Sequence, residues 1–335
     1  MSERLLSVGE AHALIAAALT ASRTSPENAS QVADALVGAE LAGQGGHGLR
    51  RVPAYAAQAR AGKVDGFAVP SAKRTRPGAV HVDAALGFAY PALGLAAREL
   101  LAITPEQGIA TAGIFRSHHA GVAGLAVEAL AEQGLVALMF ANAPASIAPW
   151  GGRRPLYGTD PIAFACPTEG GAPVVVDVSM SKVARGKIMA ANQKKEPIPE
   201  GWALDVDGNP TTDAKAALAG TMVPLGDAKG TALALMVELL CAGLTGANYA
   251  YEQSSFFDAE GAPPATGQLL IAIDPQAFGG TRALARFAEM AGLVAGMEGA
   301  RLPGSRRQAI RERFRRDGIP ADAALVTEIE QIAAG

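Results

Sequence analysis

The glycine cluster at residues 43–48, Gly-Gln-Gly-Gly-His-Gly, restricts the fold of this 335-residue chain more than any other stretch. Gly43, Gly45 and Gly48 spell the G-x-G-x-x-G pattern of doubly wound nucleotide-binding folds, which has meaning only between a strand and a helix. Here residues 25–42 predict a helix before the cluster, with a serine cap, a proline at the first helical position and apolar residues near a 3.6-residue period. The cluster therefore predicts a helix stop and a turn, and any nucleotide is expected to bind outside the doubly wound scheme.

Charge and composition exclude several classes of protein. The net charge is −3, and 18% of residues are charged without a basic run, so we expect no nucleic-acid partner. The longest apolar stretch, residues 231–244, contains Glu238 and is too short to span a bilayer, and the first residues lack the pattern of a secretory signal. The two cysteines, Cys166 and Cys241, are too few for a disulfide framework or a zinc site. We expect a cytoplasmic protein without a membrane partner and without a bound metal.

The apolar pattern changes twice along the chain. Residues 1–72 are helical in pattern, residues 73–280 alternate short β-branched runs with helical segments, and residues 281–335 return to helices. We therefore predict an α/β (α+β) fold in which the two helical ends of the chain pack together beside a central α/β domain. Residues 193–224 predict a long irregular excursion with a turn at its centre. The predicted strands are residues 80–82, 109–115, 135–140, 174–178 and 269–273. The predicted helices are residues 7–21, 25–42, 49–61, 92–103, 121–132, 182–191, 230–242, 281–293, 305–314 and 320–332.

Histidines in glycine- or serine-flanked turns are the first candidates for chemistry. His47 precedes Arg51 by four residues, so both side chains share one helical face if a helix begins in the glycine turn. An arginine can hold a carboxylate with two parallel hydrogen bonds while a neighbouring histidine donates or accepts a proton; the alternative is a capping histidine beside a surface arginine. His119, in the run Ser117-His118-His119, follows a predicted strand and opens a predicted helix, which is typical of a site or of a pair of capping histidines.

Further charged residues stand at turns, where they have either a structural or a binding role. Asp177 closes the apolar run 174–176, as a helix cap or as the group that holds a hydroxyl. Lys229 lies in a glycine-flanked turn before an apolar helix, where it neutralises a phosphate or is simply solvated. Arg301, Arg306 and Arg307 bracket a Pro-Gly turn, where they bind an extra phosphate or start a surface helix.

Taken together, these segments resemble the malate/L-lactate dehydrogenase-like oxidoreductases, a family of nicotinamide-dependent enzymes without a Rossmann fold. The family includes ureidoglycolate, sulfolactate and diketogulonate enzymes and the reductases of piperideine-2-carboxylate and pyrroline-2-carboxylate. The resemblance spans nearly the whole chain, and several ordered motifs at compatible spacing carry it. These motifs are residues 47–55 (HGLRRVPAY), 117–119 (SHH), 158–164 (GTDPIAF), 176–177 (VD), 184–187 (ARGK), 229–230 (KG), 266–269 (TGQL) and 301–307 (RLPGSRR).

The resemblance implies a homodimer with a non-Rossmann cofactor domain, whose sheet is largely antiparallel, and a helical domain built from both chain ends. The corresponding boundaries are a helical N-terminal part (1–72), a domain that binds cofactor and substrate (73–280) and a helical C-terminal part (281–335). By matching position, His47 is implied as the proton donor and Arg51 as the residue that holds the carboxylate of a small-molecule substrate. The residues implied for substrate binding are Arg51, Tyr55, Thr159, Arg185, Gly186 and Lys187. The residues implied for cofactor binding are His119, Ala120, Gly121, Val122, Ala123, Asp177, Val178, Ser179, Lys229, Arg301, Pro303, Gly304, Arg306 and Arg307. The arginine-rich last turn favours NADPH over NADH, because guanidinium groups bind an additional phosphate well.

The sequence departs from the cyclic-imine reductases at two positions. It has Gly46 where these enzymes are expected to have serine before the catalytic histidine, and Lys187 where they are expected to have aspartate. Lys187 resembles the hydroxy-acid dehydrogenases, whereas residues 117–119 and 265–270 resemble the imine reductases. The resemblance implies hydride transfer from NAD(P)H to C2 of a small 2-oxo acid or cyclic 2-imino carboxylate. The alternatives are a malate-, lactate- or ureidoglycolate-type 2-hydroxy-acid dehydrogenase that uses NAD and, from another class, a catalytically silent binding protein that keeps the fold.

Overall fold

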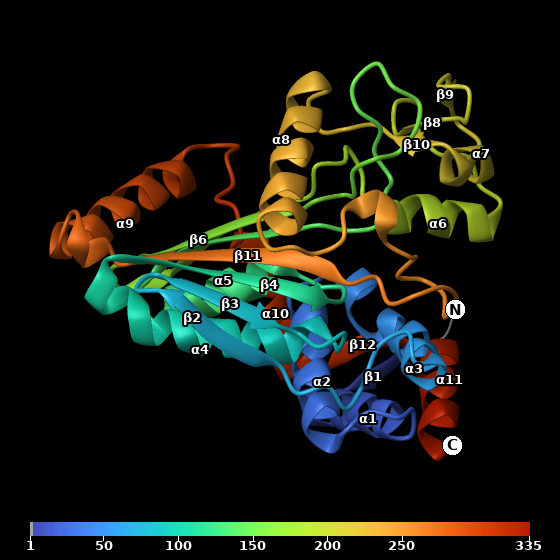
Figure 1. The fold of residues 1–335 in the computed structure, drawn as a ribbon, viewed down its shortest axis with the longest axis horizontal. Helices are drawn as coiled ribbons and strands as arrows, with labels where there is room; N and C mark the ends of the chain where they lie inside the picture. Colours follow the sequence, from blue (N-terminus) through green and yellow to red (C-terminus); the bar gives the residue numbers. More distant parts are fainter. Residues whose placement is uncertain (1–2) are drawn as a thin grey trace.

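A seven-stranded sheet lies at the centre of the molecule (Figure 1). The computed structural model describes residues 3–335, and within them the strands of this sheet follow the order β2-β3-β4-β11-β5-β6-β7. Neighbouring strands are antiparallel except β3 and β4, which are parallel. The expected non-Rossmann, largely antiparallel sheet is therefore confirmed. The strands are β2 (Ser71–Arg76), β3 (Ala79–Asp83), β4 (Ile109–Ser117), β5 (Val136–Ala141), β6 (Ile162–Thr168), β7 (Gly171–Val178) and β11 (Thr266–Ile273).

Helices cover both faces of this sheet. α4 (Ala89–Gln107) and α5 (Ala123–Glu132) lie against one face, where their buried apolar side chains join those of the strands in one core. Over the opposite face runs α8 (Ala228–Glu238), which continues into the π-helical turn η3 (Leu239–Gly243). Cys241 of this turn packs with residues of β5 and β11. The central strands are thus buried on both sides, which agrees with their nearly continuous apolar sequences.

The two ends of the chain meet in a mainly helical part below the sheet (Figure 1). Helices from both ends share one core of buried leucine, isoleucine, valine and alanine side chains. The first strand pairs antiparallel with a strand near the C-terminus, so the ends are also joined by backbone hydrogen bonds. The elements are β1 (Glu3–Leu6), α1 (Val8–Thr20), α2 (Pro26–Leu41), α3 (Val52–Ala61), α10 (Ser305–Asp317), β12 (Ile319–Asp322) and α11 (Ala323–Ala334).

The first two helices begin where their sequences place strong capping signals. Ser7 accepts a hydrogen bond from the backbone N–H of Glu10, whose side chain accepts one from the backbone of Ser7 in return. Ser25 caps α2 in the same way through Asn28, and Pro26 occupies the first helical position. These caps fix the entry of the chain into both helices, and hence the position of the turn that follows α2.

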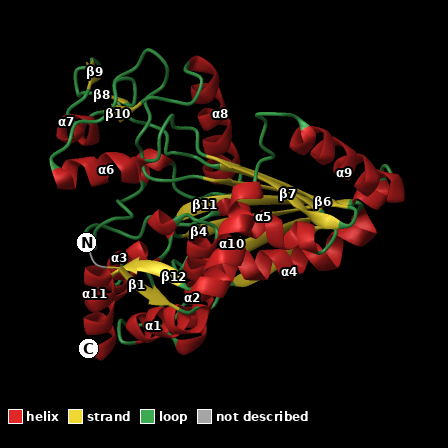
Figure 2. Ribbon diagram, turned by 180° about the vertical axis from the view of Figure 1, so that it is seen from behind, coloured by secondary structure: helices red, strands yellow, loops and turns green. Residues whose placement is uncertain are grey.

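A small lobe and an outlying helix complete the chain. The lobe lies beside α8 in Figure 1 and has its own core around a short three-stranded sheet of order β10-β8-β9. α9 (Thr281–Gly296) lies at the far end of the sheet near β6. α10 packs against α2, and Figure 2 shows α10 and α5 from behind. Among residues 3–335, no helix is long and apolar enough to cross a membrane. The lobe consists of α6 (Arg185–Lys194), β8 (Ala203–Leu204), β9 (Pro210–Thr211), α7 (Ala214–Ala219) and β10 (Thr221–Met222).

Several predicted elements need correction. Residues 320–332 were expected to be one helix, but 319–322 form β12 and the helix begins at Ala323, because Asp322 caps it. The helix expected from residue 182 begins at Arg185. The excursion 193–224 holds β8 to β10 and α7, although Asp205 does form the expected central turn by accepting hydrogen bonds from the backbone of Asp207 and Asn209. Strands β1, β2 and β6 were not predicted from the apolar pattern.

Candidate active site

The glycine turn after α2 is a pair of short 3-10 turns. They are η1 (Gly45–His47) and η2 (Leu49–Arg51), separated by Gly48, and α3 begins only at Val52. A Cβ at Gly48 would overlap the buried carboxylate of Glu40, which accepts a 2.8 Å hydrogen bond from the backbone N–H of Leu49. The expected continuous helix over residues 49–61 is therefore wrong in its first turn. His47 and Arg51 owe their relative position to this kinked turn, not to one helical face.

Arg51 is held on two sides and leaves one donor free. Its Nε donates to the carbonyl oxygen of Gly46 at 3.0 Å, and its guanidinium carbon lies 4.6 Å from the centre of the Phe257 ring. Nη1 of Arg51 is buried and has no hydrogen-bond partner among residues 3–335. A buried guanidinium N–H without an acceptor is costly, and a carboxylate is the acceptor that matches its geometry best. Nη1 of Arg51 is therefore a buried donor whose hydrogen-bonding capacity a carboxylate ligand would satisfy.

The turn after β4 forms the second wall of the site. The ring of His119 stacks on that of His47 with centres 5.2 Å apart and planes inclined by 19°. Nδ1 of His119 is hydrogen-bonded to the hydroxyl of Tyr55 in α3 at 2.6 Å, and that hydroxyl lies 3.1 Å from the hydroxyl of Tyr90 in α4. The predicted candidates His47, Arg51, Tyr55 and His119 thus gather in one cluster from two separate parts of the chain, residues 47–55 and the turn after β4.

Burial keeps the histidines of this cluster uncharged at neutral pH. It lowers the pKa of His47 to about 4, with the positive charge of Arg51 as the second cause. Burial and then the Arg51 charge lower the pKa of His118 to about 3, and they also lower the pKa of His119 well below its ordinary value. Nδ1 of His47 has no hydrogen-bond partner within the described part of the chain. A neutral imidazole beside a carboxylate-binding arginine can accept a proton from, or return one to, a ligand held by that arginine.

The residues predicted to bind a cofactor include a buried ion-pair network at the start of α5. One carboxylate oxygen of Asp177 accepts a 2.9 Å hydrogen bond from the backbone N–H of Gly124 and lies 3.5 Å from the guanidinium of Arg307. Arg307 also lies 3.7 Å from Glu128, which Arg311 binds with both of its terminal nitrogens. Nη1 of Arg307 is buried and donates no hydrogen bond to any group in residues 3–335. The network joins the first half of α5, the end of β7 and the first turns of α10.

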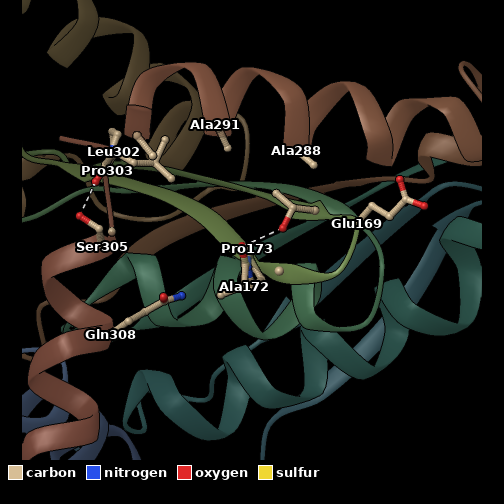
Figure 3. A pocket seen from close by; sticks show the side chains of 14 residues that line it. Glu169, Ala172, Pro173, Ala288, Ala291, Leu302, Pro303, Ser305 and Gln308 are labelled. Atoms are coloured by element: carbon tan, nitrogen blue, oxygen red, sulfur yellow. Dashed lines mark hydrogen bonds between the residues drawn. The ribbon is translucent and has the colours of Figure 1, made fainter. Parts of the chain in front are cut away.

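A groove of about 340 Å³ continues from this network along β7 (Figure 3). Ala288 and Ala291 of α9 form one wall, and Ala172 and Pro173 of the β6–β7 hairpin form the opposite wall. Pro303 and Gly304 close one end, where a Cβ on Gly304 (φ 88°) would press on the backbone of Val175. The predicted residues Pro303 and Gly304 therefore line a groove with small apolar walls, and Arg301 and Arg306, which flank them in sequence, are exposed.

The other predicted residues lie where the small lobe meets the sheet. The carbonyl oxygen of Thr159 accepts a 2.7 Å hydrogen bond from Met180, directly after Val178 and Ser179. Arg185 is half-buried and burial lowers its pKa, while Gly186, Lys187 and Lys229 are exposed. The turn that carries Lys229 is tied to the same segment, because the backbone N–H of Leu225 donates to Met180 at 2.8 Å. These residues border the small lobe, and the contacts described for them are separate from those within the His47 cluster.

Three features of the site were missed by reasoning from the sequence. Phe256 packs on His119 with ring centres 5.0 Å apart, and Phe257 lies against Arg51. Lys63 is buried beneath these aromatic residues, although a lysine after a helix suggests a surface position. Asp160 is fully buried, and burial and the nearby charge of Glu238 raise the pKa of its carboxyl group well above the usual range. The motif Gly158-Thr159-Asp160-Pro161 and the acidic residue within the apolar stretch 231–244 were the available signals for this pair.

Comparisons with known proteins agree with this architecture. Residues 6–330 match the malate/L-lactate dehydrogenase family. The chain is 49% identical to a (2R)-3-sulfolactate dehydrogenase (NADP(+)) from Chromohalobacter salexigens, over 98% of each chain. It is 38% identical to a Δ1-pyrroline-2-carboxylate reductase from Ancylobacter novellus, over 98% of this chain and 97% of that one. The crystal structure of Δ1-piperideine-2-carboxylate reductase from Pseudomonas syringae superposes with a TM-score of 0.93, at 38% identity and covering 98% and 99% of the two chains. The chain belongs to the malate/L-lactate dehydrogenase family of oxidoreductases.

Proposed function

We propose that this protein is an NAD(P)-dependent oxidoreductase that transfers a hydride to C2 of a small 2-oxo acid or cyclic 2-imino carboxylate. The observation that carries the proposal is the buried cluster of His47, Arg51, Tyr55 and His119, in which Nδ1 of His47 and Nη1 of Arg51 lack partners within residues 3–335. The named relatives, a sulfolactate dehydrogenase and two reductases of cyclic imino carboxylates, support a small carboxylate as the substrate.

Arg51 and His47 divide the work on the substrate between them. Arg51 binds the carboxylate at C1 through its free Nη1, while its contacts with Gly46 and Phe257 keep the guanidinium in place. His47 exchanges a proton with the oxygen or nitrogen on C2 as the hydride is gained or lost. His119 stacks on His47, and Tyr55 hydrogen-bonds His119, so α3 and the turn after β4 together hold the orientation of the His47 ring.

Substrate binding and the protonation of His47 are coupled through charge. The positive charge of Arg51 is the second cause, after burial, of the low pKa of His47. A substrate carboxylate neutralises this charge, so the pKa of His47 rises when the carboxylate binds. In the reductive direction, this rise prepares the imidazolium that donates the proton to the product.

The turn 119–123, the Asp177–Arg307 network and the groove at Gly304 fit a nicotinamide dinucleotide. The buried free donor of Arg307 suits a phosphate or ribose oxygen, and the flat apolar groove suits a planar ring. Val178, Ser179 and Lys229 border the same end of β7, and the exposed Arg301 and Arg306 offer cations for the additional phosphate of NADP. The dinucleotide, when bound, supplies the hydride. We favour NADPH over NADH and expect no resident metal.

A second candidate is the oxidation of a 2-hydroxy acid, and two observations favour it. The low pKa of His47 leaves it neutral at pH 7, which is the form that accepts the proton of a hydroxyl group. Arg185 and Lys187 stand together in the first turn of α6, where they could bind a second anionic group, as carried by malate or sulfolactate. A Cβ at Gly46 meets no atom within 4 Å in residues 3–335, so Gly46→Ser combined with Lys187→Asp tests this alternative. The double change should raise kcat/KM for piperideine-2-carboxylate relative to the hydroxy acid.

We further propose that the protein is a cytoplasmic homodimer and that α8 contributes to the interface. Large apolar side chains of this segment face solvent, since Leu235, Leu239 and, directly after η3, Leu244 are 43%, 52% and 67% exposed. Analytical ultracentrifugation of the wild type and of a Leu235→Glu, Leu239→Glu variant tests the dimer. A wild-type monomer at micromolar concentration would rule it out.

The experiment that tests the proposed function is a steady-state assay of dinucleotide oxidation and reduction. The substrates are pyruvate-like 2-oxo acids, both cyclic imino carboxylates and, in reverse, malate, lactate, ureidoglycolate and sulfolactate. His47→Ala should lower kcat on the order of 10²-fold or more, because it removes the proton-transferring group. Arg51→Ala should mainly raise KM for the carboxylate. Binding of the dinucleotide without turnover of any substrate would instead support a silent binding protein.

A further inference from the structure

Lys63 is a buried lysine that is bound to the loop whose Phe257 contacts Arg51. It follows α3, the helix that starts after Arg51, and only 2% of the residue is exposed. Its ammonium group donates to the carbonyl oxygens of Ser255 at 2.7 Å, Asp258 at 3.1 Å and Glu260 at 2.5 Å, and it pairs with the Asp258 carboxylate at 3.1 Å. Lysines are almost never buried unless they are paired in this way.

All of these acceptors belong to one irregular segment, residues 255–260, which we call the aromatic loop. A second side chain of α3 holds the same loop, since Nε2 of Gln58 donates to the carbonyl oxygen of Asp258 at 2.9 Å. The carbonyl groups of the loop converge on Lys63 instead of on one another. The ammonium group therefore donates to these carbonyl oxygens as backbone N–H groups do in a helix or a strand.

The aromatic loop places two phenylalanines directly on the candidate catalytic groups. Phe257 lies under the guanidinium of Arg51 at 4.6 Å, and Phe256 packs on His119 at 5.0 Å and on His118 at 5.5 Å between ring centres. Lys63 is thus connected to both sides of the site: through α3 to Arg51 and Tyr55, and through the loop to the rings that contact Arg51 and His119. Without the ammonium group, the carbonyl oxygens of Ser255 and Glu260 would lose their donor and that of Asp258 would keep only Gln58, so the loop would lose most of the hydrogen bonds that tie it to α3.

We propose that Lys63 is a positioning residue for the reaction: it fastens the aromatic loop so that Phe257 orients Arg51 and Phe256 encloses the histidine cluster. This inference rests on the proposed function for its effect on turnover, but its effect on the loop does not depend on any substrate. The lysine acts through the two rings and touches neither the substrate nor the hydride donor.

The loop itself is tested by hydrogen exchange without substrate or cofactor. Lys63→Met removes the ammonium group and keeps the length of the side chain, and Lys73→Met is the matched control because Lys73 is exposed on β2. We expect the amides of residues 254–262 to exchange faster in Lys63→Met, while those of the central strands and of Lys73→Met stay as in the wild type. Unchanged exchange in the loop of a folded Lys63→Met protein would overturn the proposal, even if the protein turned over no substrate.

The catalytic consequence is tested by a double-mutant cycle. Lys63→Met should lower kcat/KM for the carboxylate substrate on the order of 10²-fold, mainly through KM. If Lys63 acts through Phe257, the kcat/KM of the double variant Lys63→Met, Phe257→Leu will be no lower than that of the more impaired single variant. Additive losses would show that the two residues act independently and would overturn the proposal. If Lys63→Met does not fold, Asp258→Asn replaces it in the same cycle, with the same two outcomes.

Chemical rescue separates the hydrogen bonds of the ammonium group from its charge. Lys63→Ala lacks a propylammonium fragment, so added n-propylammonium should restore part of the lost kcat/KM. Tetramethylammonium carries the same charge but has no N–H donor, and it should not restore activity. Equal rescue by both ions, or rescue by neither in a folded protein, would contradict the role of the three donors.

Discussion

His118 should make the stability of the protein sensitive to acid, and the change His118→Phe should remove much of this sensitivity. The His118 ring is 1% exposed and is surrounded by the rings of Tyr55, Phe88 and Phe256. Both of its nitrogens lack a hydrogen-bond partner among the described residues. A phenylalanine keeps the aromatic packing and has no group to protonate, so it isolates the effect of the proton.

The magnitude follows from the difference in pKa between the two states. Burial and the nearby Arg51 and Lys63 charges lower the pKa of His118 to about 3 in the folded protein, whereas an unfolded chain has a histidine pKa of about 6.5. Below about pH 6.5 the unfolded state therefore binds more protons, and stability falls as the pH falls through this window toward about 3. At pH 5 the single-group linkage relation gives a loss of about 2 kcal/mol relative to pH 7.5.

The assay is urea unfolding of the wild type and of His118→Phe at pH 7.5 and pH 5. At pH 7.5 the variant should be at least as stable as the wild type, because it removes an N–H group that is buried without an acceptor in residues 3–335. The difference between the two proteins should grow by about 2 kcal/mol in favour of the variant at pH 5. Phe88→Leu is the control, since it disturbs the same packing and should shift stability equally at both pH values. Parallel pH dependence of wild type and His118→Phe would refute the reasoning.

Three other changes give distinct expected outcomes. Gly267→Ala should destabilise the protein by about 3 kcal/mol or more in thermal melts, because its Cβ would overlap the backbone carbonyl of Cys241; Gly46→Ala, in open space, should change stability by less than about 0.5 kcal/mol. Arg307→Met should raise KM for the dinucleotide more than KM for the carboxylate, and equal effects on both KM values would count against a cofactor role. The same change should destabilise the protein by about 3 kcal/mol, because it leaves Asp177 buried without its cation. Burial and the charge of Glu238 raise the pKa of Asp160 well above its usual range, so its carboxyl group carries a proton at neutral pH. Asp160→Asn keeps a hydrogen-bond donor and should have a melting temperature close to that of the wild type. Asp160→Ala should lower the free energy of unfolding by about 1–3 kcal/mol. A melting point of Asp160→Asn as low as that of Asp160→Ala would show that Asp160 is ionised.

The sequence was most informative where local signals decide the structure. Ser25 predicted the start of α2 through its capping pattern, and the helical pattern of residues 7–21 predicted α1; both helices begin as expected. Strand β2 (Ser71–Arg76) could not be predicted because all of its residues are exposed and all but Ala72 are polar. It exists because it pairs with β3, a tertiary contact that leaves no periodic apolar pattern.

The same distinction applies to the candidate site. The spacing of His47 and Arg51 and the turn position of His119 were visible as unusual places for polar residues, and the structure joins them in one cluster. Lys63 and Phe257 were not visible, since they lie almost 200 residues apart and their roles arise only from the contact between α3 and the aromatic loop. The carboxyl pair Asp160–Glu238 is hidden for the same reason, because neither residue alone signals burial against the other.

The pairing of β1 with β12 has a consequence for synthesis of the protein. Residues 3–6 find their partner strand only when residues 319–322 have been made, so the helical core that includes α1, α2 and α3 cannot close on the growing chain. The central sheet can form earlier, because its last strand, β11, ends at Ile273. His119 follows β4 of the sheet and His47 lies in the helical part, so their contact is completed only after β12 has been made. A ribosome-bound chain that stops before β12 should therefore bind no carboxylate substrate, even with its sheet already folded.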